Sequence, residues 1–556
     1  MYQQVYDPVS NSLGASSIFA ALPLLTLFVL LGGLKMKAQW ASLIALAVAL
    51  LVAMIVYSMP VGQALDAGAE GAAFGLFPIM WIVVNAVWIY SMTVKTGDFA
   101  VLRRSFASIS SDQRIQAVII AFSFGALLEA LAGFGTPVAI TSVMLITLGF
   151  KPIKAAAVAL VANTAPVAFG AIAIPIVTLA QITGLDKQDL GSMVGRQTPF
   201  LALIVPFILV LIVDGVRGLR QTWPVVLLGG FTFGLFQFLC SNYISVELTD
   251  VLASLTSVLA MVLFLRVWQP SEPLEGEPGG TGFPAVAGAS THDPALEQEL
   301  ERRDGRDDTR GEILRAYAPY LIIIAVFSLA QWGPVKDFLA NRTKMFDWPG
   351  LHVTNGKGEA IKSITFKFDW LAAAGTLLLI SGLLTMAALR VKPRIALTAY
   401  RETLDQLKWA ILTVASVLAL AYVMNLSGQT ITIGMWAAGA GSAFAFLSPI
   451  IGWLGTAITG SDTSSNSLFG ALQVTAAKDA GLDPLLLAAS NSSGGVLGKM
   501  ISPQNLAIGA AAVGMGGQEG ELFRKVLKWS LILVLIMAAL AYVQSTSVLD
   551  WMVPNT

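Results

Sequence analysis

The sequence predicts an all-α polytopic membrane protein with about 12 transmembrane helices, arranged as two inverted repeats. The first observation behind this prediction is composition, since 56% of the residues are hydrophobic, only 12% are charged, and the mean hydropathy is +0.73. Secondly, apolar runs long enough to cross a bilayer recur from end to end. Thirdly, polar interruptions occur at corresponding places in both halves, and such paired broken segments are typical of transporters with internal repeats.

The second half carries the clearest interruptions. Gly460–Asn466, GSDTSSN, is flanked by apolar runs that are each too short to cross, which predicts a re-entrant hairpin over about 448–477. Ser490–Gly495, SNSSGG, lies inside an apolar segment long enough to span, about 484–511, and predicts a break there because these residues favour local backbone bonding over helix. Bare backbone at membrane depth is tolerated only where it lines a cavity or is buried in protein. The two features together indicate a binding site.

The first half repeats this pattern. Asn, Gly and Pro stand at identical offsets of 0, 7 and 12 in the two halves, as Asn163, Gly170 and Pro175 and as Asn491, Gly498 and Pro503. About thirty residues before each Asn lies a hairpin tip, Gly133–Pro137 or Gly460–Ser464. We therefore predict a hairpin over about 115–150 and a broken helix over about 155–183 in the first repeat.

The remaining apolar runs give the other crossings in chain order. They are Ile18–Leu34, Trp40–Tyr57, Ala73–Thr93, Phe200–Val213, Pro224–Leu239, Leu252–Trp268, Tyr317–Gln331, Trp370–Leu389, Trp409–Asn425 and Val526–Val543. Residues 58–72, which include Asp66 and Glu70, are expected to be a connection, and Phe99–Ile109 an amphipathic arm on the membrane surface.

These elements divide the chain into four parts. Repeat A covers 1–215, connecting helices cover 216–269, a solvated cytoplasmic loop covers 270–314, and repeat B covers 315–556. Repeat B contains an extracellular insert, 333–369, where Asn355-Gly356 and the alternating stretch Ile361–Phe368 predict a small β-hairpin.

The orientation follows from the positive charges. Seven predicted crossings separate the starts of the repeats, an odd number, so the second repeat is inverted. Lys and Arg gather on one side, whereas the connections near 58–72, 241–250 and 427–433 contain none, which places both termini outside. Lys187, Arg196 and the insert 333–369 are exceptions to this rule.

Several functions are disfavoured. Cys240 is the only cysteine, which excludes an intrachain disulfide and a cysteine metal cluster, and the two histidines, His292 and His352, fall in polar loops. Neither GxxxxGK[ST] nor GxGxxG after a strand is present, so nothing supports ATP as the driving force. We predict no metal, no cofactor, no nucleic-acid partner and no enzymatic activity.

Three ionisable residues within predicted membrane segments are functional candidates, because burying a charge there costs about 2.5–3.5 kcal/mol on insertion scales. Asp462 stands at the second hairpin tip, Lys499 one turn past the predicted break, and Glu129 one turn before the first tip. The alternative is structural: Asp462 and Lys499 would form an ion pair that holds hairpin to helix, and Glu129 would pair with a neighbouring helix.

Polar groups surround the tips and breaks. They are Gly135, Thr136, Asn163, Thr164, Ser461, Thr463, Ser464, Ser465, Asn491, Ser492 and Ser493. Each alone is more often a helix cap or a packing residue. As a symmetric cluster at four helix ends they predict a substrate site, since free N–H groups at helix N-termini suit a small carboxylate. Lys499 is the obvious cation for such an anion.

Four motifs carry a family resemblance. Glu129–Pro137 (EALAGFGTP), Gly460–Asn466 (GSDTSSN), Asn491–Gly495 (NSSGG) and Lys499–Gln504 (KMISPQ) resemble the bacterial L-lactate permease family, which includes glycolate permeases, and the likeness covers essentially the whole chain. The resemblance implies a symporter of the bacterial cytoplasmic membrane that moves lactate, glycolate and related 2-hydroxymonocarboxylates with protons. It also implies inverted repeats and an elevator-type motion.

Within this interpretation the residues have distinct roles. Asp462 is expected to carry the proton by alternating between pairing with Lys499 and being neutral, and Glu129 is the second candidate. Lys499 and the N–H groups near Thr136 and Ser492 would bind the carboxylate, and Ser461, Thr463 or Asn491 would bind the substrate hydroxyl.

Two alternatives remain open. The chain could be a sodium-coupled carboxylate transporter, since broken helices also coordinate Na⁺ through carbonyl groups. It could also be an intramembrane enzyme with Asp462 or Lys499 as a catalytic group. The duplication argues against an enzyme, because an inverted repeat builds two gates whereas catalysis needs one site.

Overall fold

The computed structural model describes residues 2–34, 36–133, 135–274, 308–359, 361, 364–515 and 518–554. Most of the predicted loop 270–314 lies outside these residues. Within them, nine helices are long and apolar enough to cross a membrane, or ten if the pair Pro152–Ala162 and Val167–Thr183, bent by 63°, is one span. The predicted fold class, a helical protein that crosses the membrane many times, is confirmed.

The first half consists of one short strand and twelve helices. They are β1 Tyr2–Gln3, α1 Leu13–Phe28, α2 Ala38–Ile55, α3 Val61–Phe74, α4 Trp81–Lys95, α5 Asp98–Ala107, α6 Gln113–Gln116, α7 Gly125–Ala132, α8 Thr136–Thr147, α9 Pro152–Ala162, α10 Gly170–Thr183, α11 Lys187–Tyr243 and α12 Thr249–Leu265. Wider π-helical turns join α3 to α4 and α6 to α7. The longest helix, α11, is broken at Gly215 and contains two of the predicted crossings.

The second half holds the remaining strands and helices. They are α14 Arg310–Gln331, α15 Gly333–Ala340, β2 Lys344–Asp347, β3 Val353–Thr354, β4 Thr365–Phe368, α16 Ala374–Ala388, α17 Pro393–Ser427, α18 Gln429–Ala437, α19 Phe444–Thr459, α20 Asp462–Ala480, α21 Pro484–Gly498, α22 Pro503–Ala512 and α23 Glu519–Gln544. Single 3-10 turns, Val167–Phe169 and Lys499–Ile501, stand at the two helix breaks.

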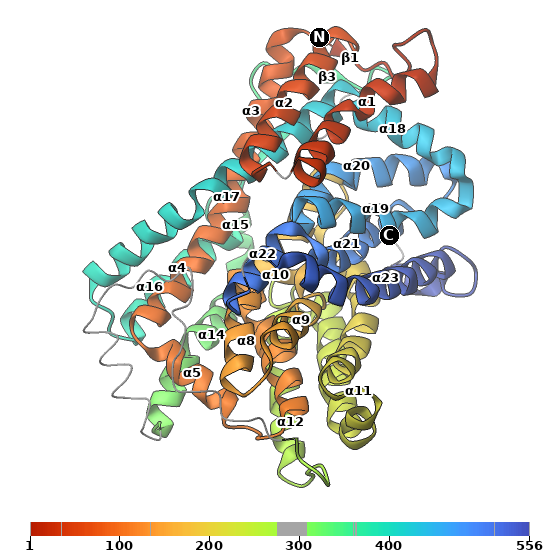
Figure 1. Ribbon diagram of the computed structural model, residues 1–556. Coiled ribbons are helices and arrows are strands. Elements are labelled where there is room, and N and C mark those ends of the chain that lie inside the picture. Colours follow the sequence, from red (N-terminus) through yellow and green to blue (C-terminus); the bar gives the residue numbers. More distant parts are fainter. Residues whose placement is uncertain are drawn as a thin grey trace.

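The helices form two groups, visible in Figure 1. In one group the long helix α17 packs against α2, α3 and α4, and α16 packs against α4. In the other group the elements of the two halves interlock, since α10 packs against α20 and α8 packs against α22. The helix pairs around the tips and breaks of both repeats therefore share one core.

Proline and capping residues explain where the broken helices restart. Pro152, Pro484 and Pro503 each occupy the first turn of their helix, where the missing N–H costs nothing. The side chains of Asp483 and Ser502 accept hydrogen bonds from the backbone N–H three residues later. The half-helices α21 and α22 thus begin at sharp, locally encoded positions.

The break in the second repeat lies later than predicted. The stretch Ser490–Gly495 is helical throughout, and the interruption falls at Lys499–Ser502. The glycines serve packing, because a side chain on Gly494 or Gly498 would collide with carbonyl oxygens of α19. Small residues at such contacts let membrane helices approach closely. The side chains of Ser490, Asn491 and Ser492 form hydrogen bonds with neighbouring helices instead of with their own backbone.

The insert also differs from its prediction. Strand β4 pairs antiparallel with β2, whereas β3, just before Asn355-Gly356, pairs in parallel with β1 at the N-terminus. The Tyr2 hydroxyl donates to the carbonyls of Tyr57 and Ser427. The predicted hairpin across Asn355-Gly356 is therefore wrong: the strand before this turn pairs with the N-terminus, and the strand formed by Thr365–Phe368 pairs with β2.

The expected connection 58–72 is also mostly helical. Asp66 and Glu70 lie in α3, and Glu70 is fully buried. The reason is close packing on α17, since a side chain on Gly71 or Gly75 would lie within 3 Å of the α17 backbone. The tight contact makes α3 part of the helical core.

Candidate functional site

Both hairpin tips lie against the same half-helix, α22. Each tip turns at a glycine in the left-handed region, Gly135 with φ +85° and Gly460 with φ +78°. Side chains at these glycines would collide with Ile508 and Gln504 of α22, respectively. The two repeats therefore meet where the polar tip residues and the second break come together.

A buried ion pair joins the repeats at this point. Lys499 Nζ donates to Glu129 Oε1 at 2.6 Å, and the two side chains are only 8% and 4% exposed. The other carboxylate oxygen, Oε2, accepts from Asn163 Nδ2 at 2.9 Å. The pair thus links the first hairpin, the first break and the second break.

Glycines enclose the Glu129 carboxylate. A side chain on Gly133 would lie 3.1 Å from Glu129 Oε1, and one on Gly170 would lie 2.9 Å from it. Burying two charges is favourable only when they are paired and hydrogen-bonded. The close backbone walls and the Asn163 bond supply that setting.

Asp462 has different surroundings from those predicted. Its Oδ2 accepts from Ser492 Oγ at 2.7 Å and from Asn466 Nδ2 at 3.5 Å. Within the described residues Oδ1 has no hydrogen-bond partner, and Asp462 forms no ion pair. The expected Asp462–Lys499 pair is not formed in this structure, because Lys499 is bound to Glu129 of the other repeat.

An amide network extends from Asp462 along α20. Asn466 Nδ2 donates to Ser492 Oγ, Asn491 Nδ2 donates to Asn466 Oδ1, and Gln473 Nε2 donates to Asn491 Oδ1, all at 2.9–3.0 Å. Asn466 Nδ2 also lies 3.2 Å from the carbonyl of Pro175 in the first repeat. Asn491 is therefore held inside the protein by two side chains.

Gln473 is a member of this network that the sequence analysis did not predict. Its spacing could have indicated it, since residues 462, 466 and 473 are four and seven positions apart and share one face of a helix. The polar face of α20 continues for three turns beyond the tip.

The other predicted residues divide between capping and partial exposure. Ser461 Oγ caps α20 by accepting from Ser464 N, and Thr164 Oγ1 donates to the carbonyl of Val161. Ser493 Oγ is buried with no partner within the described residues. Thr136, Ser461 and Thr463 at the tips are half-buried.

A second buried acid was also missed. Asp250, in the first turn of α12, is fully buried, and its Oδ1 accepts from Gln237 Nε2 at 3.0 Å. The same nitrogen lies 3.3 Å from the carbonyl of Ala165 at the first break. Sequence reasoning placed residue 250 at the end of a polar connection, where no apolar pattern indicated burial.

Many helices long and apolar enough to cross a membrane, interlocked hairpins, and a buried ion pair that joins one hairpin to a helix break are typical of a multi-pass membrane transporter. Comparison with known proteins makes the assignment specific: residues 16–548 match the L-lactate permease family, and the chain belongs to that family. The resemblance seen in the motifs is confirmed.

Relatives match over the whole length. The L-lactate permease of Escherichia coli K12 is 44% identical over 100% of both chains, and that of Bacillus subtilis 168 is 41% identical over 100% of both. The glycolate permease GlcA of Escherichia coli K12 is 42% identical over 98% of both. Among solved structures, MtrF of Neisseria gonorrhoeae superposes with a TM-score of 0.46 at 15% identity, covering 87% of this chain and 84% of its own.

Proposed function

We propose that this protein is a secondary active symporter that imports L-lactate, glycolate and related 2-hydroxymonocarboxylates with protons across the bacterial cytoplasmic membrane. Full-length relatives named for lactate and for glycolate support the substrate class. The single observation that carries the coupling is the buried pair between Glu129 and Lys499.

The pair provides a way to exchange a proton for a carboxylate. When a substrate carboxylate binds Lys499 it displaces Glu129, and the displaced Glu129 carboxylate takes up a proton. The site then holds one cation and one anion both before and after binding. Since moving a net charge through the bilayer core is costly, this neutrality suits transport of substrate and proton together.

The same electrostatics discourage uncoupled movement. Removing one partner from a buried ion pair costs about 3–5 kcal/mol, because the other charge is left uncompensated. An empty site with Glu129 protonated, or a loaded site with Glu129 ionised, carries such an unbalanced charge. Substrate and proton are therefore expected to bind in a one-to-one ratio at this pair.

Recognition of the 2-hydroxyl falls to the half-buried tip residues. Ser461 and Thr463 have hydroxyl groups that both donate and accept. Asn491, the third predicted contact, is already bonded to Gln473 and Asn466 and is the weaker candidate. The N–H groups around Gly135 and Thr136 complete the anion site from the first tip.

The proposal includes an orientation in the membrane and a transport motion. The clustering of Lys and Arg supports termini on the outer side of the inner membrane. We further propose that the core with the hairpins moves against the group built on α17, as an elevator does. Trapping the site with cross-links between α17 and α20, which pack together, would test this motion.

One experiment separates the proton mechanism from the sodium alternative. Purified protein in liposomes is given labelled L-lactate with a pH gradient alone, a Na⁺ gradient alone, or neither. We expect accumulation against the lactate gradient only with an inward proton gradient. Accumulation driven by Na⁺ at equal pH would replace the proton with sodium, and no uptake under any gradient would reject the substrate class.

A further inference from the structure

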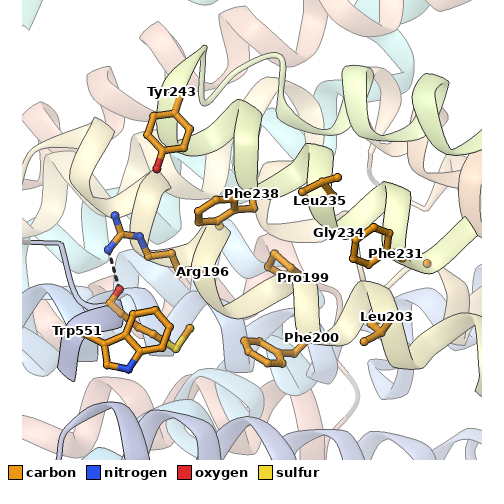
Figure 2. Close-up of a pocket in the computed structure, with 13 residues that line it drawn as sticks. Arg196, Pro199, Phe200, Leu203, Phe231, Gly234, Leu235, Phe238, Tyr243 and Trp551 are labelled. Carbon is orange, nitrogen blue, oxygen red and sulfur yellow. Dashed lines mark hydrogen bonds between the residues drawn. The ribbon is translucent and has the colours of Figure 1, made fainter. Parts of the chain in front are cut away.

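A groove of about 540 Å³ lies along α11, whose two arms before and after Gly215 run antiparallel (Figure 2). Lining positions on the arms have the same spacing, 195, 196, 199, 200 and 203 on one and 230, 231, 234, 235 and 238 on the other. This spacing places them on one face of each arm.

Glycines form the floor of this α11 groove. A side chain on Gly230 would lie 2.8 Å from the carbonyl oxygen of Ala202, and one on Gly234 would lie 3.1 Å from that of Pro199. The arms therefore touch by backbone, and larger side chains stand on both sides. Phe200 and Phe231 are 42% and 55% exposed, on helices apolar enough to span the bilayer.

One end of the groove is positively charged. Arg196 Nε donates to Asn242 Oδ1, and Nη1 donates to the carbonyl of Met552, both at 2.9 Å. Both partners are neutral, and Arg196 forms no ion pair within the described residues. Since no carboxylate of the described residues pairs with this guanidinium, its charge favours binding of an anion that is not part of the chain.

The same end carries aromatic residues typical of the membrane interface. Tyr243 and Trp551 are 72% and 73% exposed and line the groove beside Arg196 (Figure 2). Trp and Tyr are enriched at the level of the lipid headgroups. The opposite end is apolar, with Leu203 and Phe231.

The length of the groove matches one leaflet. Positions 196 to 203 span about 11 Å of helix at 1.5 Å per residue, and one leaflet of hydrocarbon is about 15 Å deep. We propose that the groove binds a phospholipid with an anionic headgroup, with the headgroup at Arg196 and one acyl chain along the aromatic walls.

The test compares lipids on the purified, delipidated full-length protein in detergent. Phosphatidylglycerol or phosphatidylcholine is added, and bound lipid is counted by native mass spectrometry while the melting temperature is recorded. We expect phosphatidylglycerol to bind about tenfold more tightly, as one charge-assisted contact predicts. Arg196→Gln should remove this preference, whereas Arg524→Gln, the same charge change on an exposed side chain of α23, should keep it.

A second variant tests the acyl-chain site. Leu235→Trp, at a position 38% exposed, should fill the groove and weaken both lipids. Equal binding of the two lipids by the wild type, or an unchanged preference in Arg196→Gln, would overturn the proposal. So would a melting shift from inorganic phosphate as large as that from phosphatidylglycerol, because acyl chains would then add nothing.

A second copy of the chain is the competing occupant. Phe231→Cys on a Cys240→Ala background supplies one exposed thiol in the groove. Absence of a cross-linked dimer in native membranes agrees with a lipid, and efficient cross-linking would assign the groove to a homodimer and overturn the lipid site.

Discussion

Each hairpin carries one buried carboxylate near its tip, and the two carboxylates have unlike partners. Glu129 of the first hairpin is bonded to a lysine and an amide, so its charge is balanced. Asp462 of the second hairpin is bonded to a hydroxyl and, at 3.5 Å, to an amide, and no cation pairs with it within the described residues.

Because the two carboxylates have different partners, the two repeats of this protein do not form equivalent sites. The only lysine at the breaks, Lys499, belongs to the second repeat but serves the hairpin of the first. In our proposal the acid that exchanges its place with a substrate carboxylate is therefore Glu129, whereas Asp462 accepts hydrogen bonds from the polar network of α20.

The largest effect is expected from Lys499→Met. It removes the cation that we propose binds the substrate carboxylate. It also leaves the buried Glu129 without its ion-pair partner, which costs about 3–5 kcal/mol. Uptake of labelled lactate should fall by at least about 100-fold, the equivalent of 2.8 kcal/mol. Lys478→Met, at the exposed far end of α20, is the matched control and should transport normally.

Adding Glu129→Gln to Lys499→Met sharpens this result. The double variant no longer leaves Glu129 as a buried charge without its cation, so its melting temperature should recover relative to Lys499→Met while uptake stays lost. Recovered uptake would show that Lys499 is structural only.

The next effect distinguishes coupling from binding. Glu129→Gln cannot take up a proton, so accumulation driven by a pH gradient should be lost. Exchange of labelled lactate for internal lactate should continue, because Lys499 remains free to bind the carboxylate. Counterflow and gradient-driven uptake in the same liposomes measure both, with Glu402→Gln, a half-exposed partner of Lys95, as the control. Full accumulation in Glu129→Gln would remove Glu129 from the coupling mechanism.

The positions of the hairpins, the first helix break and the buried charges could be predicted from the sequence, because each depends on a local sequence pattern. The polar island Gly460–Asn466 between short apolar runs predicts the second tip, the repeat spacing before Asn163 predicts the first, and helix-starting Pro503 lies in the motif Lys499–Gln504. The intramembrane ionisable residues Glu129, Asp462 and Lys499 were also found, since charges are rare in such segments.

The pairing of these charges could not be predicted. Lys499 and Glu129 are 370 positions apart, and which hairpin reaches which break depends on how the repeats interlock. The glycines Gly494 and Gly495 predict a break because composition does not distinguish flexible backbone from close helix packing. Asp250 was missed for a related reason, as its burial comes entirely from neighbouring helices.

A smaller effect is expected when substrate analogues that lack the hydroxyl or the methyl group compete with lactate. If Lys499 binds the carboxylate, the hydroxyl reaches toward Ser461 or Thr463 at the second tip. A buried group left without its hydroxyl partner costs about 1–3 kcal/mol. Propionate should therefore compete with lactate about ten- to a hundredfold more weakly, and glycolate, which lacks only a methyl worth about 0.8 kcal/mol, within severalfold. Propionate that matches lactate would remove the hydroxyl contact, and strong inhibition by succinate would favour a dicarboxylate transporter.

The smallest effect is expected from Asp462→Asn, which tests the comparison most directly. The amide retains an oxygen that accepts from Ser492, so the network of α20 keeps its geometry. Because Asp462 exchanges no partner with the substrate in our proposal, accumulation should stay within about fivefold of the wild type, the equivalent of one neutral hydrogen bond of ~1 kcal/mol. Asp462→Leu, which deprives Ser492 and Asn466 of their acceptor, should lower the melting temperature as well. Loss of accumulation in Asp462→Asn with exchange intact would assign the proton to Asp462, and Glu129 would then serve only to hold Lys499.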